Sequence, residues 1–306
     1  MNRDGRYAPS PSGPLHLGNL RTALLAWLFA RAAEARFLIR VEDLDPDRSK
    51  PEHAESQLAD LTALGIDWDD SLPPQSERLE RYEKAISQLR SEGLIYECFC
   101  TRTEVREAAS APHGELPEGA YPGTCRDLSG PEREARRAAG RPAALRVRAG
   151  AARIEFEDRL RGPQAGIVDD FVVRRNDGVH GYLLATSVDD SEQGIGEVVR
   201  GRDLLDSVPR QIWLAGALGL PAIESWAHVP LVIGADGERL AKRHGAVTLS
   251  DRRELGETPA EVLGLLASSL GLCEAGKAVR PQDLLAGFEA SSLPAEDGLL
   301  AALEPQ

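Results

Sequence analysis

A strand, a helix and a second strand within about 40 residues limit the fold of this chain more than any other feature. Residues 3–8 predict a short strand, and residues 19–35 carry apolar side chains at helical spacing. Residues 36–45, RFLIRVEDLD, predict a buried strand that ends in acidic residues. Such a βαβ unit requires a parallel sheet. Ligands bind parallel sheets at the carboxyl ends of the strands, where the acids and the turn before the helix would lie.

Later segments continue the alternation of helices and strands. Residues 52–64 and 77–92 predict helices, and residues 153–156 and 167–174 predict short strands. Residues 103–150 are rich in Gly, Pro, Ala and Arg and lack a clean hydrophobic period. This composition favours an insertion with a loop-rich core.

The second half of the chain returns to regular patterns. Residues 181–190, GYLLATSVDD, predict an apolar strand, and residues 197–219 predict a strand, a turn and a helix. The dipeptide Asp236-Gly237 is a hairpin signal, and a cationic loop follows it. The remaining residues predict helices that give way to a weakly patterned end.

Composition excludes several classes of protein. The chain has 306 residues, enough for about two domains, and its net charge of −13 argues against a generally basic nucleic-acid coat. Residues 1–5 lack the apolar core of a secretory signal, and the longest apolar run, residues 23–30, is too short to span a membrane. We therefore expect a cytoplasmic protein without a membrane partner. Its four cysteines then favour free thiols or metal ligands over disulfides.

The turn before the first helix is unusually restricted. Pro9, Pro11 and Pro14 each fix a backbone angle, and Gly13 permits a close approach. The helix that follows offers free N–H groups and the positive end of its dipole to an anion. His16 lies at that end, so the turn predicts a phosphate site. A rigid loop with an incidental histidine is the alternative.

A second candidate phosphate contact lies far along the chain. Lys242 stands in a loop that contains Gly and Arg, and a lysine that reaches a transferring phosphate stabilises the charge that develops there. Taken alone, this loop is equally typical of a solvated surface.

The two loops together resemble the HIGH and KMSKS signatures of class I aminoacyl-tRNA synthetases, as His16-Leu17-Gly18-Asn19 and Arg239-Leu240-Ala241-Lys242-Arg243. The sequence around the first signature, RYAPSPSGPLHLGNLRTAL, and three further stretches, FLIRVEDLD, GYLLATSVDD and GEVVRGRDLLDSVPRQ, resemble the glutamyl branch of that class. The resemblance implies an α/β, Rossmann-type parallel-sheet fold with a zinc-bearing insertion and a short helical C-terminal region. This chain departs from the signatures at Asn19, Arg239, Leu240 and Ala241, and Ala241 lacks a hydroxyl that could contact phosphate.

The resemblance also implies the site residues. ATP would be held by His16, Gly18, Asn19 and Lys242, with His16 and Lys242 catalytic. The chemistry of the glutamate pocket is consistent with its substrate, since arginines can bind two carboxylates and an acid can bind the ammonium group. The implied lining of that pocket is Arg6, Tyr7, Ala8, Pro9, Ser10, Glu42, Tyr182 and Arg200.

The cysteine spacing predicts part of a zinc site. Cys98, Cys100 and Cys125 can supply three ligands of a tetrahedral zinc ion. Both His113 and Tyr121 can complete the set. The short relatives called glutamyl-queuosine tRNA(Asp) synthetases carry a Cys-x-Cys…Tyr-x-x-x-Cys pattern, and that resemblance implies Tyr121. The zinc would be structural, whereas Cys273 reads as a core residue.

The resemblance divides the chain into four parts. Residues 1–95 and 176–240 would form the two halves of the catalytic domain, and residues 96–175 the insertion with the zinc site. Residues 241–306 would form the KMSKS-like loop and a helical region like the one that contacts the tRNA stem. About sixty residues are too few for a further anticodon-binding domain of normal size.

This arrangement resembles the glutamyl-queuosine tRNA(Asp) synthetases over the whole length. The resemblance implies a monomer that activates L-glutamate with ATP and Mg²⁺ without tRNA. It then transfers the glutamyl group to queuosine in the anticodon stem-loop of tRNA(Asp). Residues 132–153 hold seven arginines and are a candidate RNA surface, or alternatively an ordinary solvated face.

Three other functions remain open at this stage. A truncated glutamyl-tRNA synthetase would charge a tRNA 3′ end. A small-molecule nucleotidylyltransferase would also use a His-x-Gly turn with ATP, but it has no need of the zinc insertion. A catalytically silent zinc-bearing RNA-binding module would not need His16, Glu42, Arg200 and Lys242.

Overall fold

A seven-stranded sheet organises the structure, a computed structural model that describes residues 3–109, 120–234, 236, 240 and 247–299. The strand order is β3-β2-β1-β9-β10-β6-β7, and neighbours are parallel except for the β6–β7 pair. The strands are β1 Gly5–Tyr7, β2 Phe37–Arg40, β3 Asp70–Leu72, β6 Arg153–Asp158, β7 Gly162–Ile167, β9 Glu197–Gly201 and β10 Ser225–Val229.

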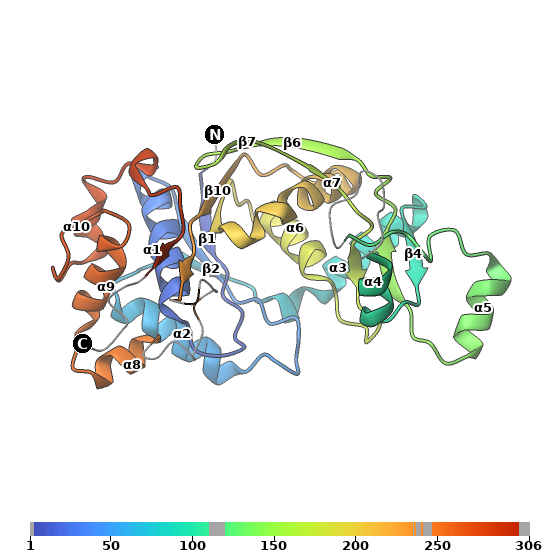
Figure 1. The fold of residues 1–306 in the computed structure, drawn as a ribbon, viewed down its shortest axis with the longest axis horizontal. Coiled ribbons are helices and arrows are strands. Elements are labelled where there is room, and N and C mark those ends of the chain that lie inside the picture. The colour runs from blue at the N-terminus through green and yellow to red at the C-terminus, as the bar shows by residue number, and fades with distance from the viewer. Residues whose placement is uncertain (1–2, 110–119, 235, 237–239, 241–246, 300–306) are drawn as a thin grey trace.

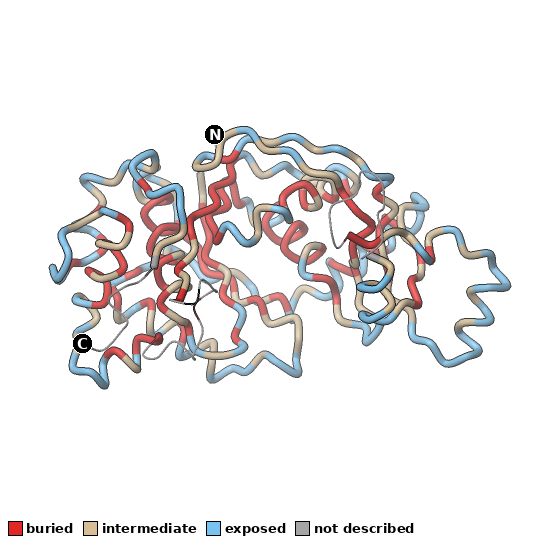
Figure 2. Tube along the Cα trace, in the orientation of Figure 1, coloured by how far each residue is buried: buried red, intermediate tan, exposed pale blue. Residues whose placement is uncertain are grey.

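Helices cover both faces of this sheet (Figure 1). Helix α1, Leu17–Ala32, lies on one face, and α6, Tyr182–Glu192, and α7, Val208–Leu218, lie on the other. Helices α9, Pro259–Ser268, and α10, Pro281–Leu285, pack on the outer side of α1. Helix α1 is therefore buried along most of its length (Figure 2), which explains its nearly continuous apolar sequence.

The remaining elements frame this core. Helices α2, Pro51–Ala63, and α3, Leu79–Ser91, confirm the helices predicted near 52–64 and 77–92. Helix α8, Leu249–Glu254, precedes α9, and β11, Val232–Ile233, pairs in parallel with β12, Gly298–Leu299. Within the described residues, no helix has the length and apolarity that a membrane crossing requires.

A smaller sheet lies at the far end of the molecule (Figure 1). It joins β4, Ile95–Cys98, β5, Ala144–Val147, and β8, Val172–Arg174, in antiparallel order. Helices α4, Arg102–Ala109, and α5, Gly130–Ala138, accompany it. The expectation of a loop-rich core over 103–150 was wrong at these two helices. Both are short and strongly polar, so neither contains an apolar run that would reveal it in the sequence.

Two strand predictions also need correction. Residues 181–190 form most of α6 rather than a strand. Every residue from Leu184 to Ser191 is buried, so the helix has no polar face to reveal its 3.6-residue period. Residues 167–174 are strand only at Val172–Arg174, while Ile167 ends β7. The predicted hairpin at Asp236-Gly237 falls largely outside the described residues.

The order in which the chain adds strands to the sheet reverses at β1. The chain leaves β1 through α1 toward β2 on one side, while β9 pairs with the other side of β1. Crevices at the carboxyl ends of parallel strands open at such switch points, and ligands bind there.

Candidate active site

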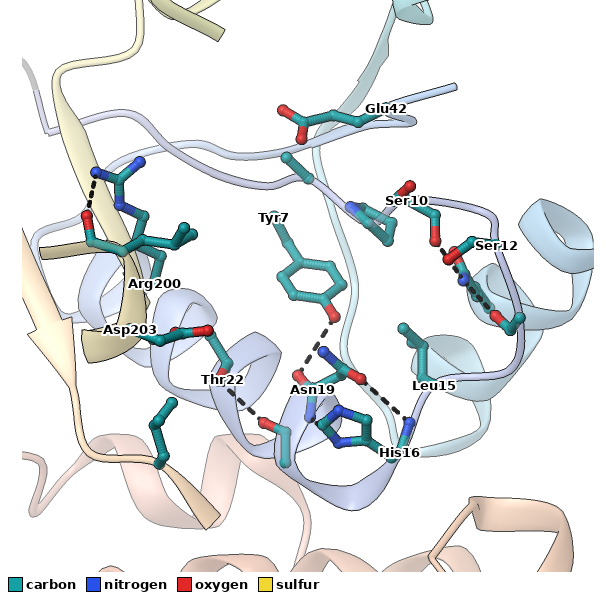
Figure 3. A pocket seen from close by; sticks show the side chains of 18 of the residues that line it. Tyr7, Ser10, Ser12, Leu15, His16, Asn19, Thr22, Glu42, Arg200 and Asp203 are labelled. Atoms are coloured by element: carbon teal, nitrogen blue, oxygen red, sulfur yellow. Dashed lines mark hydrogen bonds between the residues drawn. The ribbon is translucent and has the colours of Figure 1, made fainter. Parts of the chain in front are cut away.

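A cavity of about 600 Å³ opens at the carboxyl ends of β1 and β9. Figure 3 shows Arg200 and Asp203 on one side of it, Ser10 and Ser12 on the other, and Tyr7 between them. Arg6 lies behind this lining, and Lys242 falls outside the described residues. The predicted site residues that line the cavity are Tyr7, Ala8, Pro9, Ser10, His16, Gly18, Asn19, Glu42, Tyr182 and Arg200.

The proline turn is held through its carbonyl groups. The backbone N–H of Glu42 donates to the Pro9 carbonyl at 2.9 Å, and that of Lys50 donates to the Pro11 carbonyl at 3.0 Å. Proline has no N–H to donate, so these contacts tie the turn to the chain that follows β2. This fixes the cavity wall before any ligand binds.

Gln57 adds a side-chain clamp that sequence reasoning missed. Its Nε2 donates to the carbonyls of Ser10 at 3.0 Å and Gly13 at 2.6 Å, and the side chain is 1% exposed. A lone glutamine on a polar helix gives no sequence signal for such a role. Its buried position between helix α2 and the turn follows only from the tertiary fold.

His16 caps helix α1 and faces the cavity. The Asn19 N–H donates to His16 Nδ1 at 3.2 Å, and the His16 N–H donates to Asn19 Oδ1 at 3.3 Å. Because Nδ1 accepts, a neutral His16 carries its proton on Nε2 and can donate it to an anion. A side chain on Gly18 would lie 3.1 Å from the His16 ring, so glycine leaves room for the imidazole.

The ends of the Lys242 segment are anchored beside this helix. The Leu17 N–H donates to the Val247 carbonyl at 2.7 Å, and the Leu240 N–H donates to the Val232 carbonyl at 3.2 Å. Val232 lines the cavity. The residues on both sides of 241–246 therefore lie next to the site.

A buried charge network supports the opposite wall. Arg6 forms two contacts of 3.1 Å with Asp190, and Arg40 contacts Asp190 at 2.7 Å and Glu42 at 3.1 Å. Burial opposes the ionisation of Asp190, but Arg40 and Arg6 hold its pKa below the ordinary value. Burial raises the pKa of Glu42 against the attraction of the same arginines. The network can thus present an acid to an ammonium group.

A second buried acid lies behind the first. Asp189 accepts from Arg78 at 2.6 Å, from Tyr82 at 2.8 Å and from Gln75 at 2.9 Å. Neither Asp189 nor Asp190 was among the predicted site residues. The available signal in the sequence was the pair of adjacent acids within an apolar run. Acids that are buried with such a run need oppositely charged or hydrogen-bonding partners, so they mark a buried charge network.

Arg200 projects into the cavity from the end of β9. Its Nη2 donates to the Leu204 carbonyl at 3.1 Å, and its Nε donates to His228 Nε2 at 3.0 Å. Tyr182 lines the cavity, where its position inside the cleft and the negative charge of Glu42 raise the pKa of its hydroxyl. The hydroxyl is therefore a neutral donor at physiological pH.

The three predicted cysteines meet in the insertion. Their sulfur atoms lie within 4.8 Å of one another, with Cys100 and Cys125 3.5 Å apart. The Tyr121 hydroxyl lies 3.4 Å from the Cys98 sulfur and 3.6 Å from that of Cys100. Tetrahedral zinc separates sulfur ligands by about 3.8 Å and a sulfur from an oxygen ligand by about 3.5 Å. The four groups fit zinc, and His113 lies outside the described residues.

The arginines of residues 132–153 are largely paired. Arg137 contacts Glu97 and Glu134, Arg141 contacts Glu104, and Arg148 contacts Asp127. Arg146 lies 3.8 Å above the Tyr121 ring and donates to the Asp170 carbonyl. An RNA surface on this segment stays a prediction.

Comparison with known proteins agrees with this architecture. Residues 4–277 match the family described as tRNA synthetases class I (E and Q), catalytic domain. The chain belongs to this family. A relative from Nocardia farcinica, named glutamyl-Q tRNA(Asp) synthetase, is 59% identical over 97% of this chain and 92% of its own. A relative of the same name from Symbiobacterium thermophilum is 50% identical over 95% and 94% of the two chains.

Solved structures extend the comparison to this class I fold. A glutamate tRNA ligase from Elizabethkingia meningosepticum, in complex with its amino acid, superposes with a TM-score of 0.81 at 26% identity. The match covers 99% of this chain and 68% of that ligase. The alignments with the two glutamyl-Q relatives thus cover almost all of this chain and of each relative. The alignment with the ligase covers about two thirds of the ligase.

Proposed function

We propose that this protein activates L-glutamate with ATP and transfers the glutamyl group to queuosine in the anticodon stem-loop of tRNA(Asp). The observation that carries the proposal is one cavity that joins the Glu42 carboxylate, the Arg200 side chain and the capped start of helix α1, with Arg6 behind its lining. The names of the full-length relatives supply the acceptor.

The residues divide the cavity into two parts. Glu42 binds the ammonium group of glutamate, and Arg200 binds a carboxylate. Arg6, which lies behind the lining, adds positive charge that attracts the carboxylates. Tyr7, Ala8, Pro9, Ser10 and Tyr182 complete that pocket. His16, Gly18 and Asn19 bind ATP beside the α1 N-terminus, and Lys242 reaches the same phosphates.

The first step forms glutamyl-adenylate. The α-carboxylate of glutamate attacks the α-phosphorus of ATP, and pyrophosphate leaves. His16 Nε2–H and the α1 N-terminus donate to the phosphate oxygens, while Lys242 neutralises the charge on the leaving pyrophosphate. ATP enters as its magnesium complex. This first step does not require tRNA.

The second step uses the adenylate. A hydroxyl of the queuosine cyclopentenediol attacks the activated carbonyl carbon and loses its proton to solvent, an ester forms, and AMP leaves with the bonding electrons of the C–O bond. For this reason the anticodon loop, rather than the tRNA 3′ end, enters the cavity.

The other parts of the chain support these steps. Residues 1–95 and 176–240 form the catalytic core in this proposal. Residues 96–175 carry one structural zinc ion on Cys98, Cys100, Tyr121 and Cys125. Strands β6 and β7 of that segment also extend the large sheet. Residues 241–306 carry the Lys242 loop and the helical region.

Glutamate-dependent ATP–pyrophosphate exchange in the absence of tRNA tests the first step. We expect exchange with glutamate and not with aspartate or glutamine. His16→Ala and Lys242→Ala are each expected to lower kcat by about 100-fold or more. Lys277→Ala, which changes a lysine outside the site, is the matched control and keeps wild-type exchange.

Transfer of labelled glutamate tests the acceptor. We expect labelling of tRNA(Asp) that contains queuosine and none of the same tRNA with guanosine at that position. Exchange that requires tRNA, followed by labelling of a 3′ end, would instead identify a tRNA-charging enzyme.

A further inference from the structure

A histidine contacts Arg200 from behind, on the side away from the proline turn. Arg200 and His228 are direct partners in the register of parallel strands β9 and β10. Arg200 Nε lies 3.0 Å from His228 Nε2, and His228 is fully buried. Since arginine can only donate, His228 Nε2 must accept, and a neutral His228 therefore carries its proton on Nδ1.

Asp158 fixes that protonation state. Its carboxylate lies 2.6 Å from His228 Nδ1, and it also accepts the backbone N–H of His228 at 3.1 Å and of Leu160 at 3.0 Å. Asp158 is 1% exposed. Burial, assisted by Arg200, lowers the pKa of His228 against the opposing effect of Asp158. The imidazole is thus neutral at physiological pH, with Nδ1–H directed at the acid.

The two arginines of the site differ in their direct partners. Arg6 contacts the Asp190 carboxylate through two nitrogens. Arg200 contacts a neutral imidazole and the Leu204 carbonyl, and within the described residues its buried Nη1 has no hydrogen-bond partner. The acid behind Arg200, Asp158, does not contact it directly, because the imidazole ring of His228 lies between them. Arg200 is therefore held in position while its charge stays available to a carboxylate.

Trp226 closes the side of this assembly. Its ring is stacked on His228 with a centroid distance of 6.4 Å and an interplanar angle of 14°, and Arg200 Cζ lies 5.3 Å from its centroid. The stacking limits rotation of the imidazole. Arg200, which contacts both rings, lines the cavity shown in Figure 3.

We propose that His228 and Asp158 are positioning residues for Arg200, which they aim at the side-chain carboxylate of the substrate without neutralising it. This rests on the proposed glutamate function. A neutral acceptor between two charges is the feature that matters, because an acid in direct contact with Arg200 would compete with the substrate. The pair therefore contributes to the selection of a dicarboxylic amino acid over its neutral amide.

Two replacements of His228 separate its contact with Asp158 from its contact with Arg200. In His228→Asn the amide takes the place of Nδ1 and can keep the contact with Asp158, but nothing occupies the position of Nε2. In His228→Gln the side-chain carbonyl reaches the position of Nε2 and again accepts from Arg200. We expect the KM for glutamate in ATP–pyrophosphate exchange to rise about tenfold or more in His228→Asn. We expect it to stay within about threefold of wild type in His228→Gln.

Two readouts distinguish positioning from a general structural role. The KM for ATP and the inhibition constant of L-glutamine should stay within about twofold in both variants, since neither depends on a carboxylate at Arg200. Equal weakening of glutamate and glutamine, or equal KM values for glutamate in the two variants, would overturn the proposal. If His228→Asn does not fold, His228→Gln alone tests the proposal. A variant with the wild-type melting temperature and a tenfold higher glutamate KM would overturn the proposal.

The proposed function fails separately from this inference. Absence of glutamate-dependent exchange by the wild-type enzyme refutes the function itself. Wild-type exchange together with an unchanged glutamate KM in His228→Asn refutes only the role of His228 and Asp158.

Discussion

Arg6 and Asp190 are 184 positions apart in the sequence and meet through two contacts of 3.1 Å, Nε to Oδ1 and Nη2 to Oδ2. Both side chains are almost completely buried. Arg40 contacts the same carboxylate at 2.7 Å. One acid from helix α6 therefore supports two arginines from neighbouring strands β1 and β2. It holds together the two halves of the chain that flank the cavity.

Asp190→Asn leaves two buried guanidinium groups without this anion. We expect it to lower the free energy of unfolding at neutral pH by about 3 kcal/mol or more, measured by urea denaturation. The pKa of Asp190 is depressed in the folded protein, so the stability it contributes is present above the ordinary aspartate value of about 3.9. That contribution is lost as the pH falls through the folded pKa, and the difference between variant and wild type should shrink there.

Glu155→Gln is the matched control for this change. Glu155 also pairs with an arginine, Arg153, but both side chains are largely exposed. Its replacement should alter the free energy of unfolding by no more than about 0.5 kcal/mol. Equal effects of the two substitutions would show that the Asp190 network is not a stabilising element.

Glu42 should make glutamate binding pH-dependent. Burial raises its pKa, so the carboxyl takes up a proton at a higher pH than an exposed glutamate and then no longer attracts an ammonium group. We expect the KM for glutamate to rise as the pH falls from about 8 to about 5.5, a range in which the substrate carboxylates stay ionised. The measurement is ATP–pyrophosphate exchange at saturating ATP.

Glu42→Gln separates binding from stability. An acid whose pKa is raised by folding contributes stability below its unfolded pKa and loses it as the pH rises, so removal of the charge should not destabilise the protein at neutral pH. The variant should have a high glutamate KM that no longer depends on pH. A pH dependence that persists in Glu42→Gln would assign it to another group.

Gln57→Leu tests whether the proline turn must be held from behind. The substitution keeps the size of the side chain but removes its hydrogen bonds to the carbonyls of Ser10, which still accepts from the Ser12 N–H at 2.9 Å, and Gly13. Each lost hydrogen bond costs about 0.5–1.5 kcal/mol, so we expect a lower melting temperature. We also expect a higher KM for both ATP and glutamate, because the turn lines both parts of the cavity.

Gln88→Leu is the control for Gln57→Leu. Gln88 is exposed on helix α3, although its Nε2 also donates to a carbonyl, that of Leu218, at 3.3 Å. Its loss should change the free energy of unfolding by about 0.5 kcal/mol or less and leave exchange unaltered. Unchanged KM values in Gln57→Leu would mean that Glu42 and Lys50 hold the turn without it.

The local parts of this fold could be predicted from sequence. Strands β1 and β2 and helix α1 were found because their periodicity is contained in the segments themselves. Helix α6 was mistaken for a strand because its burial on all sides erases the helical period. Strand β7, GPQAGI, has no apolar alternation and owes its structure to pairing with β6.

The candidate site divides in the same way. His16, Glu42 and Arg200 stand in contiguous motifs and could be proposed from the sequence. Asp158 and His228 stand in no motif, and their relation to Arg200 depends on the register of β9 with β10 and on the end of β6. Sequence patterns identify groups that contact ligands more readily than groups that hold them in place.

Tyr121→Phe decides the fourth ligand of the cysteine cluster. Its hydroxyl lies within 3.6 Å of the Cys98 and Cys100 sulfur atoms, so its removal should leave three ligands and weaken zinc binding about tenfold or more. Cys125→Ser should abolish binding and lower the melting temperature, because a zinc ion held there would join β4 to the segment that follows α4. His113→Ala and Cys273→Ser should both keep one zinc per chain, measured by elemental analysis after dialysis against a weak chelator. Retention of zinc by Tyr121→Phe together with its loss from His113→Ala would assign the fourth position to His113.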